Sequence, residues 1–165
     1  MLLIRQLSPA DSLEELTRLL HRAYAQLGAM GLNYTAVNQP IETTVRRLSG
    51  GHCFVAEWQR QLAGTVLAKP TEQSSECEYF TRQGVATLRQ FGVEPQLQGR
   101  GIGQALVRAC ETWARERGFR ELALDTAEPA THLLQLYSRL GFSPVGFVQW
   151  HGKVYRSVVL SKALQ

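Results

Sequence analysis

One short glycine-rich stretch limits what this chain can fold into more than any other feature. Residues Gln98 to Gln104 read Gln-Gly-Arg-Gly-Ile-Gly-Gln, follow a strand-like segment that ends near Val93, and run directly into an amphipathic helical pattern. Glycines in such a turn let the backbone approach a ligand closely, and the free N–H groups and dipole of a helix start attract negative charge. The order of strand, glycine turn and helix therefore predicts a site for a phosphate-bearing ligand, with a diphosphate cofactor as the leading candidate.

The spacing of the glycines argues against two common nucleotide-binding turns. A G-x-G-x-x-G fingerprint counted from Gly99 would need its third glycine at position 104, which is Gln104. A P-loop would need Lys and then Ser or Thr after its last glycine, but Gln104 and Ala105 follow Gly103. The turn must therefore belong to another class of phosphate site.

Hydrophobic periodicity and turn residues predict the remaining elements. For segment 69–84 two interpretations remain: a long loop, or a strand extended by Glu78-Tyr79-Phe80. The order predicts a three-layer α/β (α+β) fold with a mixed, mostly antiparallel central sheet flanked by helices, as one domain over residues 1–165. In chain order we expect a strand at 2–7, a helix at 13–27, a helix at 40–48, strands at 52–57 and 62–68, a strand at 85–93, a helix at 102–118, a strand at 121–126, a helix at 129–141, and strands at 144–150 and 154–160.

Composition narrows the class of protein further. No apolar run approaches the length of a membrane span, so no membrane partner is expected. The odd set Cys53, Cys77 and Cys110 has no paired spacing, which predicts reduced thiols and a cytoplasmic protein. The histidines show no ligand spacing, so we expect no metal site.

The net charge of +4 lies entirely in the half of the chain that holds the glycine turn. Residues 1–84 carry 8 basic and 8 acidic side chains, whereas residues 85–165 carry 10 and 6. This distribution suits a polyanionic ligand, although a merely solvated face explains it equally well. No basic run or interleaved aromatic stripe occurs, so nucleic acid is not an expected partner.

Two motifs together resemble a known family. The stretch Gln98-Gly99-Arg100-Gly101-Ile102-Gly103 is similar to the Gln/Arg-x-x-Gly-x-Gly/Ala acyl-CoA loop of the GCN5-related N-acetyltransferases (GNAT). Downstream, Leu136-Tyr137-Ser138-Arg139-Leu140-Gly141-Phe142 resembles that family's Leu-Tyr-x-x-x-Gly-Phe motif, in the right order and separation. The resemblance implies the acyl-CoA N-acyltransferase fold. It also implies acetyl transfer from acetyl-CoA to a primary amine by direct attack, with no covalent enzyme intermediate.

The resemblance also assigns contacts to acetyl-CoA as co-substrate, without a metal. Backbone groups of Phe91, Gly92 and Val93 are expected to pair with the pantetheine arm, and the Val93 N–H is expected to face the thioester oxygen. Gly92, inside a strand pattern, indicates a bulge or a close backbone approach. The pyrophosphate is expected at Gln98, Gly99, Arg100, Gly101, Ile102, Gly103 and Gln104.

One position departs from the family pattern. Ala130 stands where many members have an asparagine that contacts the pantetheine arm. Either the hydroxyl of Thr131 replaces that contact, or the contact is absent.

Tyr137 matches the family tyrosine that protonates the CoA thiolate, although a core tyrosine at helical spacing would give the same pattern. Glu94 and Asp125 are the candidate bases for removing the proton of the amine, and surface or capping carboxylates are the competing interpretation. The catalytic prediction is therefore Tyr137, Glu94 and Asp125.

The acceptor stays open among a small amine, an amino acid, an antibiotic and a protein N-terminus. Aromatic side chains are weak candidates for its pocket, namely Tyr24, Tyr34, Tyr79, Phe80, Trp150 and Tyr155. Two further alternatives stay open: a homodimer, and a non-catalytic acyl-CoA-binding regulatory module of the same fold.

Overall fold

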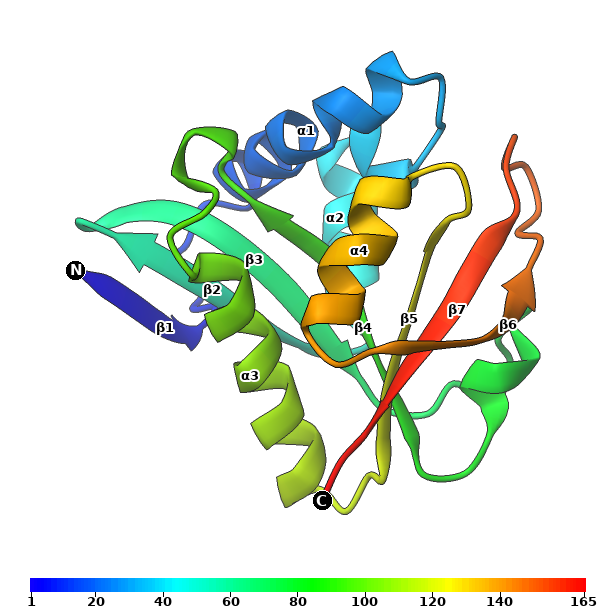
Figure 1. The fold of residues 1–165 in the computed structure, drawn as a ribbon. Coiled ribbons are helices and arrows are strands. Elements are labelled where there is room, and N and C mark those ends of the chain that lie inside the picture. The colour runs from blue at the N-terminus through cyan, green and yellow to red at the C-terminus, as the bar shows by residue number, and fades with distance from the viewer.

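A seven-stranded sheet organises the chain in the computed structural model, which describes residues 1–165 (Figure 1). Its strand order is β1-β2-β3-β4-β5-β7-β6, and every neighbouring pair is antiparallel except β4 with β5. The predicted mixed, mostly antiparallel sheet is thus confirmed. The strands are β1 (Leu2–Gln6), β2 (His52–Trp58), β3 (Gln61–Lys69), β4 (Val85–Val93), β5 (Glu121–Ala127), β6 (Ser143–Val148) and β7 (Ser157–Ala163).

Four α-helices cover the two faces of this sheet: α1 (Leu13–Ala29), α2 (Ile41–Leu48), α3 (Ile102–Glu116) and α4 (Thr131–Arg139). Helices α3 and α4 lie on one face, and α1 and α2 lie on the other (Figure 1). Helix α1 begins at the predicted turn, because the Ser12 side chain accepts a hydrogen bond from the Glu15 N–H. The three predicted layers are present.

The hydrophobic core has clusters on both faces of the sheet, because successive strand residues point to opposite faces. Val66 on β3 packs with Leu106 of α3 in the main cluster, whereas its neighbour Leu67 packs with Leu16 of α1 on the opposite face. Neighbouring residues of a strand face opposite sides of the sheet, so β3 supplies both cores at once.

The parallel strands β4 and β5 pair with each other at one end only. Its register runs over Val85, Ala86 and Thr87 of β4, opposite Glu121, Leu122 and Ala123 of β5, and stops there. The remaining residues of β4 continue to Val93 without a partner on that side. The two strands therefore diverge and leave backbone groups of β4 free in the middle of the sheet.

The last two strands differ from the sequence prediction. They occupy 143–148 and 157–163, so the second starts three residues later than expected. The intervening loop is longer because side chains hold it: Asn33 bonds to Gly152 and Val154, and the Gln149 amide donates to the carbonyls of Lys153 and Tyr155.

Two smaller boundaries also move. Segment 69–84 adds no strand, because Glu78–Thr81 forms a 3₁₀ turn whose Phe80 is fully buried. Helix α4 begins at Thr131 and not at Pro129, because the chain turns first at residues 127–130.

No helix combines the length and the apolar character needed to cross a bilayer. Cys53, Cys77 and Cys110 are buried and free.

Candidate active site

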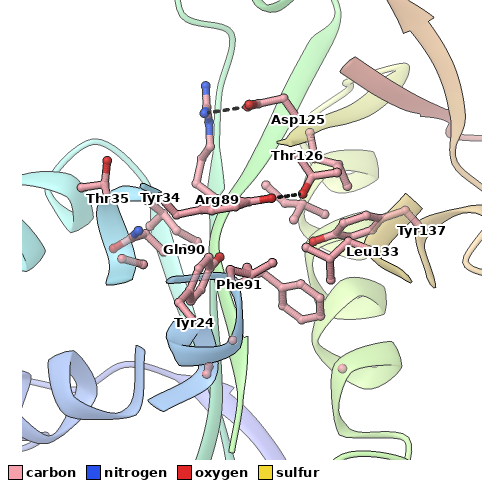
Figure 2. Close-up of a pocket in the computed structure, with 18 of the residues that line it drawn as sticks. Tyr24, Tyr34, Thr35, Arg89, Gln90, Phe91, Asp125, Thr126, Leu133 and Tyr137 are labelled. Carbon is pink, nitrogen blue, oxygen red and sulfur yellow. Dashed lines mark hydrogen bonds and ion pairs between the residues drawn. The ribbon is translucent and has the colours of Figure 1, made fainter. Parts of the chain in front are cut away.

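A cavity of about 1080 Å³ opens where β4 and β5 diverge. Side chains from both sheet faces border it: Tyr24 of α1, Phe91 of β4 and Tyr137 of α4 reach toward one space (Figure 2). The glycine turn lines one end, and residues of α2 and of the loop after β6 line the other. The cavity therefore continues from the predicted phosphate site into a second compartment, which lies at the end lined by α2 and by the loop after β6.

A bulge in β4 shapes the wall of this cavity. The register with β3 passes from Thr65–Gly92 to Leu67–Arg89, so β4 contains one extra residue there. Gln90 takes the left-handed conformation, with φ of 53°. The sequence prediction located a bulge or a close approach at Gly92. The bulge lies at Gln90, and Gly92 is the close approach, since a Cβ there would lie 3.0 Å from the Ala23 Cβ.

The register leaves the Val93 backbone facing the cavity side. The Glu94 N–H donates to the Ala63 carbonyl at 2.8 Å, and Gly92 lies opposite Thr65. Because bonding to one neighbour alternates along an antiparallel strand, Gly92 bonds to β3 whereas the Val93 N–H points toward the open edge. Of the expected backbone contacts, the register turns the Val93 N–H to the cavity and the Gly92 N–H toward β3.

The glycine turn presents an unbroken row of donors. No backbone N–H from Gly99 to Gln104 donates to a protein acceptor, and the first bond of α3 is from Ala105 to Gly101. Gly99 and Gly101 have φ near +80°, a conformation that other residues rarely adopt. Gly103 leaves room beside Phe91, because a Cβ would lie 3.1 Å from the Phe91 ring. Such a cradle binds a diphosphate.

Tyr137 projects from α4 into the same cavity (Figure 2). Its ring packs against Phe91, with centroids 6.2 Å apart, and against Phe142. Its hydroxyl makes no hydrogen bond within the protein, although the residue is only 7% exposed. Burial, followed by the nearby Tyr24, Tyr34 and Asp125, raises the pKa of Tyr137 well above its ordinary value. The phenol is therefore a neutral donor at physiological pH.

The two candidate bases lie in different surroundings. Asp125 lines the cavity, where it pairs with Arg89 at 3.2 Å (Figure 2). It also accepts a hydrogen bond from the Trp150 indole at 2.7 Å. Glu94 is absent from the lining and forms a bidentate ion pair with Arg22 of α1, at 2.9 and 2.7 Å. The structure brings only Asp125 to the space that Tyr137 faces.

Two predicted cofactor residues do not reach the cavity wall. Arg100 is exposed, and its guanidinium lies 5.5 Å from the Trp58 ring centroid. Thr131 is the exposed first residue of α4, whereas Ala130 is fully buried. The other ten assigned positions line the cavity: Phe91, Gly92, Val93, Gln98, Gly99, Gly101, Ile102, Gly103, Gln104 and Tyr137.

The second compartment has an aromatic wall of three tyrosines. Tyr34 packs against Tyr24 and Tyr155, with centroids 5.6 and 5.1 Å apart. The Tyr34 hydroxyl accepts from the Ala127 N–H and lies 2.8 Å from the Thr126 hydroxyl, which fixes the ring between α1 and β5. Of the six aromatic candidates, Tyr79 and Phe80 lie outside the lining, and the others belong to it.

Two cationic side chains of this compartment carry no recognisable sequence pattern, Arg47 of α2 and Lys153 of the loop after β6. The same holds for Gln90, whose side-chain oxygen accepts a hydrogen bond from Gln39 at 3.0 Å. Arg46 and Arg47 are neighbours in a short amphipathic helix and both line the cavity, and no local signal tells that Arg47 is the more buried of the two. No group of three or more His, Cys, Asp or Glu side chains gathers as metal ligands do.

The open parallel pair, the bulged strand and the donor-rich turn lie together around one cavity, in a fold that acyltransferases share. The chain belongs to the Acetyltransferase (GNAT) family, whose model matches residues 13–142.

Individual relatives agree with this assignment. Human N-acetyltransferase 8B is 34% identical over 102 residues, a stretch that covers 61% of this chain and 43% of that protein. The chain thus matches less than half the length of this relative. Among solved structures, the ribosomal-protein-S18-alanine N-acetyltransferase of Escherichia coli superposes with a TM-score of 0.75 at 18% identity, covering 100% of this chain and 95% of the other. A GNAT acetyltransferase from Elizabethkingia anophelis with acetyl-CoA bound gives 0.70 at 16% identity, covering 99% and 98%. At these identities the two structures establish the fold.

Proposed function

We propose that this protein transfers an acetyl group from acetyl-CoA to a primary amine by direct attack. One observation carries the proposal: the free N–H row from Gly99 to Gln104 and the unbonded hydroxyl of Tyr137 border one cavity. The first suits a pyrophosphate, and the second suits the sulfur that leaves when a thioester is cleaved. The structural relative with acetyl-CoA bound supports the same co-substrate.

The chain's own groups hold and polarise the acyl donor. Acetyl-CoA supplies a thioester whose C–S bond breaks as a C–N bond forms to the amine. The turn at Gly99–Gln104 would bind the pyrophosphate, and the free edge of β4 would pair with the pantetheine amides. The Val93 N–H would donate to the carbonyl oxygen as negative charge develops there, a contribution typically of about 3 kcal/mol.

Two protons must move during the transfer. Asp125 is proposed to accept the proton of the amine, directly or through water, because it is the candidate carboxylate on the cavity wall. Tyr137 is proposed to donate a proton to the departing thiolate. Its raised pKa keeps it protonated, so its proton remains available at every physiological pH.

Thermal unfolding with and without acetyl-CoA tests the site. A ligand at a hundredfold its dissociation constant stabilises by about 2.7 kcal/mol, which for a chain of this size raises the midpoint by roughly 5–10 °C. Replacing Gly101 and Gly103 together by Val should abolish the shift, because side chains there strain the turn and press on Phe91. Gly118→Val is the matched control, because Gly118 has the same positive φ but lies outside the cavity. No shift in the wild type at saturating acetyl-CoA would refute the proposal.

A non-catalytic acyl-CoA-binding module is the alternative function. It would show the same thermal shift but release no CoA thiol with any amine. A screen of amines for thiol release, run on the wild type and on Tyr137→Phe, therefore separates the two functions.

A further inference from the structure

The second compartment of the cavity, where the amine acceptor would bind, is called the acceptor compartment. It contains more positive charge than its carboxylates neutralise. Lys69 pairs with Glu72 at 3.1 Å, and Arg89 pairs with Asp125 at 3.2 Å. These two pairs account for the inward-facing carboxylates, because Glu76, the remaining acidic lining residue, is exposed. Arg47 and Lys153 also line the compartment, and neither has a carboxylate within ion-pair distance.

The polar contacts of these two cations are neutral and leave donors free. Arg47 is half-buried, and its one hydrogen bond is a long one, 3.4 Å from Nη1 to the Gln39 side-chain oxygen. The Lys153 ammonium donates to the Asn33 carbonyl at 2.7 Å and to the Thr35 hydroxyl at 2.9 Å. A guanidinium has five N–H donors and an ammonium has three, so both retain donors for a ligand.

The surroundings hold each cation in place. Gln39 is 2% exposed and also bonds to Thr44 and to Gln90 at the β4 bulge, so the group that contacts Arg47 is part of a rigid buried network. Asn33 and Thr35 likewise anchor Lys153 across the loop after β6. Ordering a cation beforehand lowers the entropy cost of binding an anion to it.

The charges of Arg47 and Lys153 are only partly offset by Asp125, which acts to raise the pKa of both. Burial, and then the neighbouring Arg47, lower the pKa of Lys153; burial also lowers that of Arg47. The tyrosines do not supply a compensating charge, since burial raises the pKa of Tyr24, Tyr34 and Tyr155 and keeps them neutral. An anion bound here would relieve both the desolvation and the mutual repulsion.

Building on the acetyl transfer proposed above, we infer that the acceptor is an amine that also carries a carboxylate, as an amino acid does. The carboxylate binds between the Arg47 guanidinium and the Lys153 ammonium, which directs the amine toward Asp125 and the free edge of β4. Planar guanidinium and carboxylate groups bond in a bidentate manner, so this contact selects carboxylates over neutral amides. The aromatic wall of Tyr24, Tyr34 and Tyr155 covers the carbon skeleton between the two ends.

Matched pools of acceptors test this inference. The twenty amino acids, their carboxamides and the corresponding amines without a carboxylate are each offered with acetyl-CoA, and release of CoA thiol is followed. We expect kcat/KM for the best amino acid to exceed that of its own amide and descarboxy amine about 10- to 100-fold, the range for a hydrogen-bonded charge pair. The carboxamides resemble a peptide N-terminus, and the descarboxy compounds are simple amines. Turnover of either pool that equals or exceeds turnover of the amino acids would overturn the inference.

Variants of the two cations make the test specific. Arg47→Gln should raise KM for the amino acid by a similar factor and leave the amide unchanged, and Arg47→Lys should recover part of the loss. Lys153→Met should act in the same direction. Arg108→Gln, on the exposed side of α3, is the matched control and should change neither value. Equal losses for amino acid and amide in Arg47→Gln would show a merely structural role and would also overturn the inference.

Binding measurements keep this inference separable from the proposed function. Each variant is first checked for the thermal shift with acetyl-CoA, which reports the cofactor end alone. If the wild type shows that shift but neither turns over any amino acid nor gains stability from one in the presence of CoA, the carboxylate inference fails while the acyl-CoA site stands. If the acetyl-CoA shift is itself absent, the proposed function fails.

Discussion

Tyr137 is the side chain whose removal tests the chemistry with least disturbance to the fold. Its hydroxyl makes no hydrogen bond within the protein, so Tyr137→Phe removes a proton donor and no native contact. We expect kcat to fall about 100-fold or more, while the thermal shift with acetyl-CoA stays as in the wild type. Tyr79→Phe is the converse control: it loses a hydrogen bond to Glu121 outside the cavity, so stability should fall and kcat should not. Unchanged turnover in Tyr137→Phe would remove the residue from the mechanism.

The two candidate carboxylates can be separated by their pH profiles. A base that must be deprotonated gives kcat/KM an ascending limb at low pH, and we expect Asp125→Asn to lose both activity and that limb. Glu94→Gln breaks only the ion pair with Arg22, whose side chain is 51% exposed. The substitution should therefore cost at most about 1 kcal/mol of stability and leave the pH profile intact. The reverse result, with the limb lost in the Glu94 variant, would assign the base to the end of β4.

The close contact of α1 with β4 depends on the absence of a side chain at Gly92. A Cβ there would lie 3.0 Å from the Ala23 Cβ and 3.4 Å from Leu20 Cδ2, so the helix must shift to accept it. We expect Gly92→Ala to lower the free energy of unfolding by about 1–3 kcal/mol, measured by urea denaturation. It should also raise KM for the acceptor, because Tyr24 lies on the same helix. Gly146→Ala on β6 meets nothing within 4 Å, and a similar loss there would show that strand glycine itself is the cause.

Local chemistry made much of this site predictable from sequence. The glycine turn was predictable because positive φ, free N–H groups and a helix start all arise within one short segment. The position of Tyr137 on a helix was predictable because its motif includes Gly141, just after the end of α4. The carboxylates were harder to separate, since Glu94 directly follows β4 and Asp125 lies within β5, and neither position by itself indicates a base. Only the fold reveals that Arg22, 72 positions away in sequence, binds Glu94.

The contacts that shape the acceptor compartment are long-range and leave no sequence pattern. At the bulge, the Gln90 side chain accepts a hydrogen bond from Gln39, 51 residues earlier. The β6–β7 loop keeps its length because Asn33 bonds to it across 119 residues. Arg47 and Lys153 line one cavity for the same reason. Segments far apart in sequence converge there, and this is why the acceptor could not be assigned before the fold was known.

Buried acidic groups make the stability of the folded chain depend on alkaline pH. Burial raises the pKa of Cys53 to about 11, and it also raises that of Cys110, of Tyr24 and of Tyr155. In the unfolded chain thiols titrate near 8.5 and phenols near 10, so the unfolded state loses these protons first. The stability they contribute is therefore complete below about pH 8 and declines as pH rises toward 11.

Urea unfolding at pH 7.5 and pH 10, under reducing conditions, measures this dependence. We expect a lower free energy of unfolding at pH 10, with Cys53 alone accounting for about 2 kcal/mol of the loss at that pH, which still lies below its folded pKa of about 11. Cys53→Ala should be less stable than the wild type at pH 7.5, because it leaves a small void beside Leu16 and Val55, yet it should lose less between the two pH values. The contrast isolates proton linkage from packing, since a void costs the same at both pH values whereas a thiol that must ionise does not. An identical loss in variant and wild type would mean that Cys53 exchanges protons equally in both states, and the alkaline decline would then belong to Cys110 and to the tyrosines that wall the acceptor compartment.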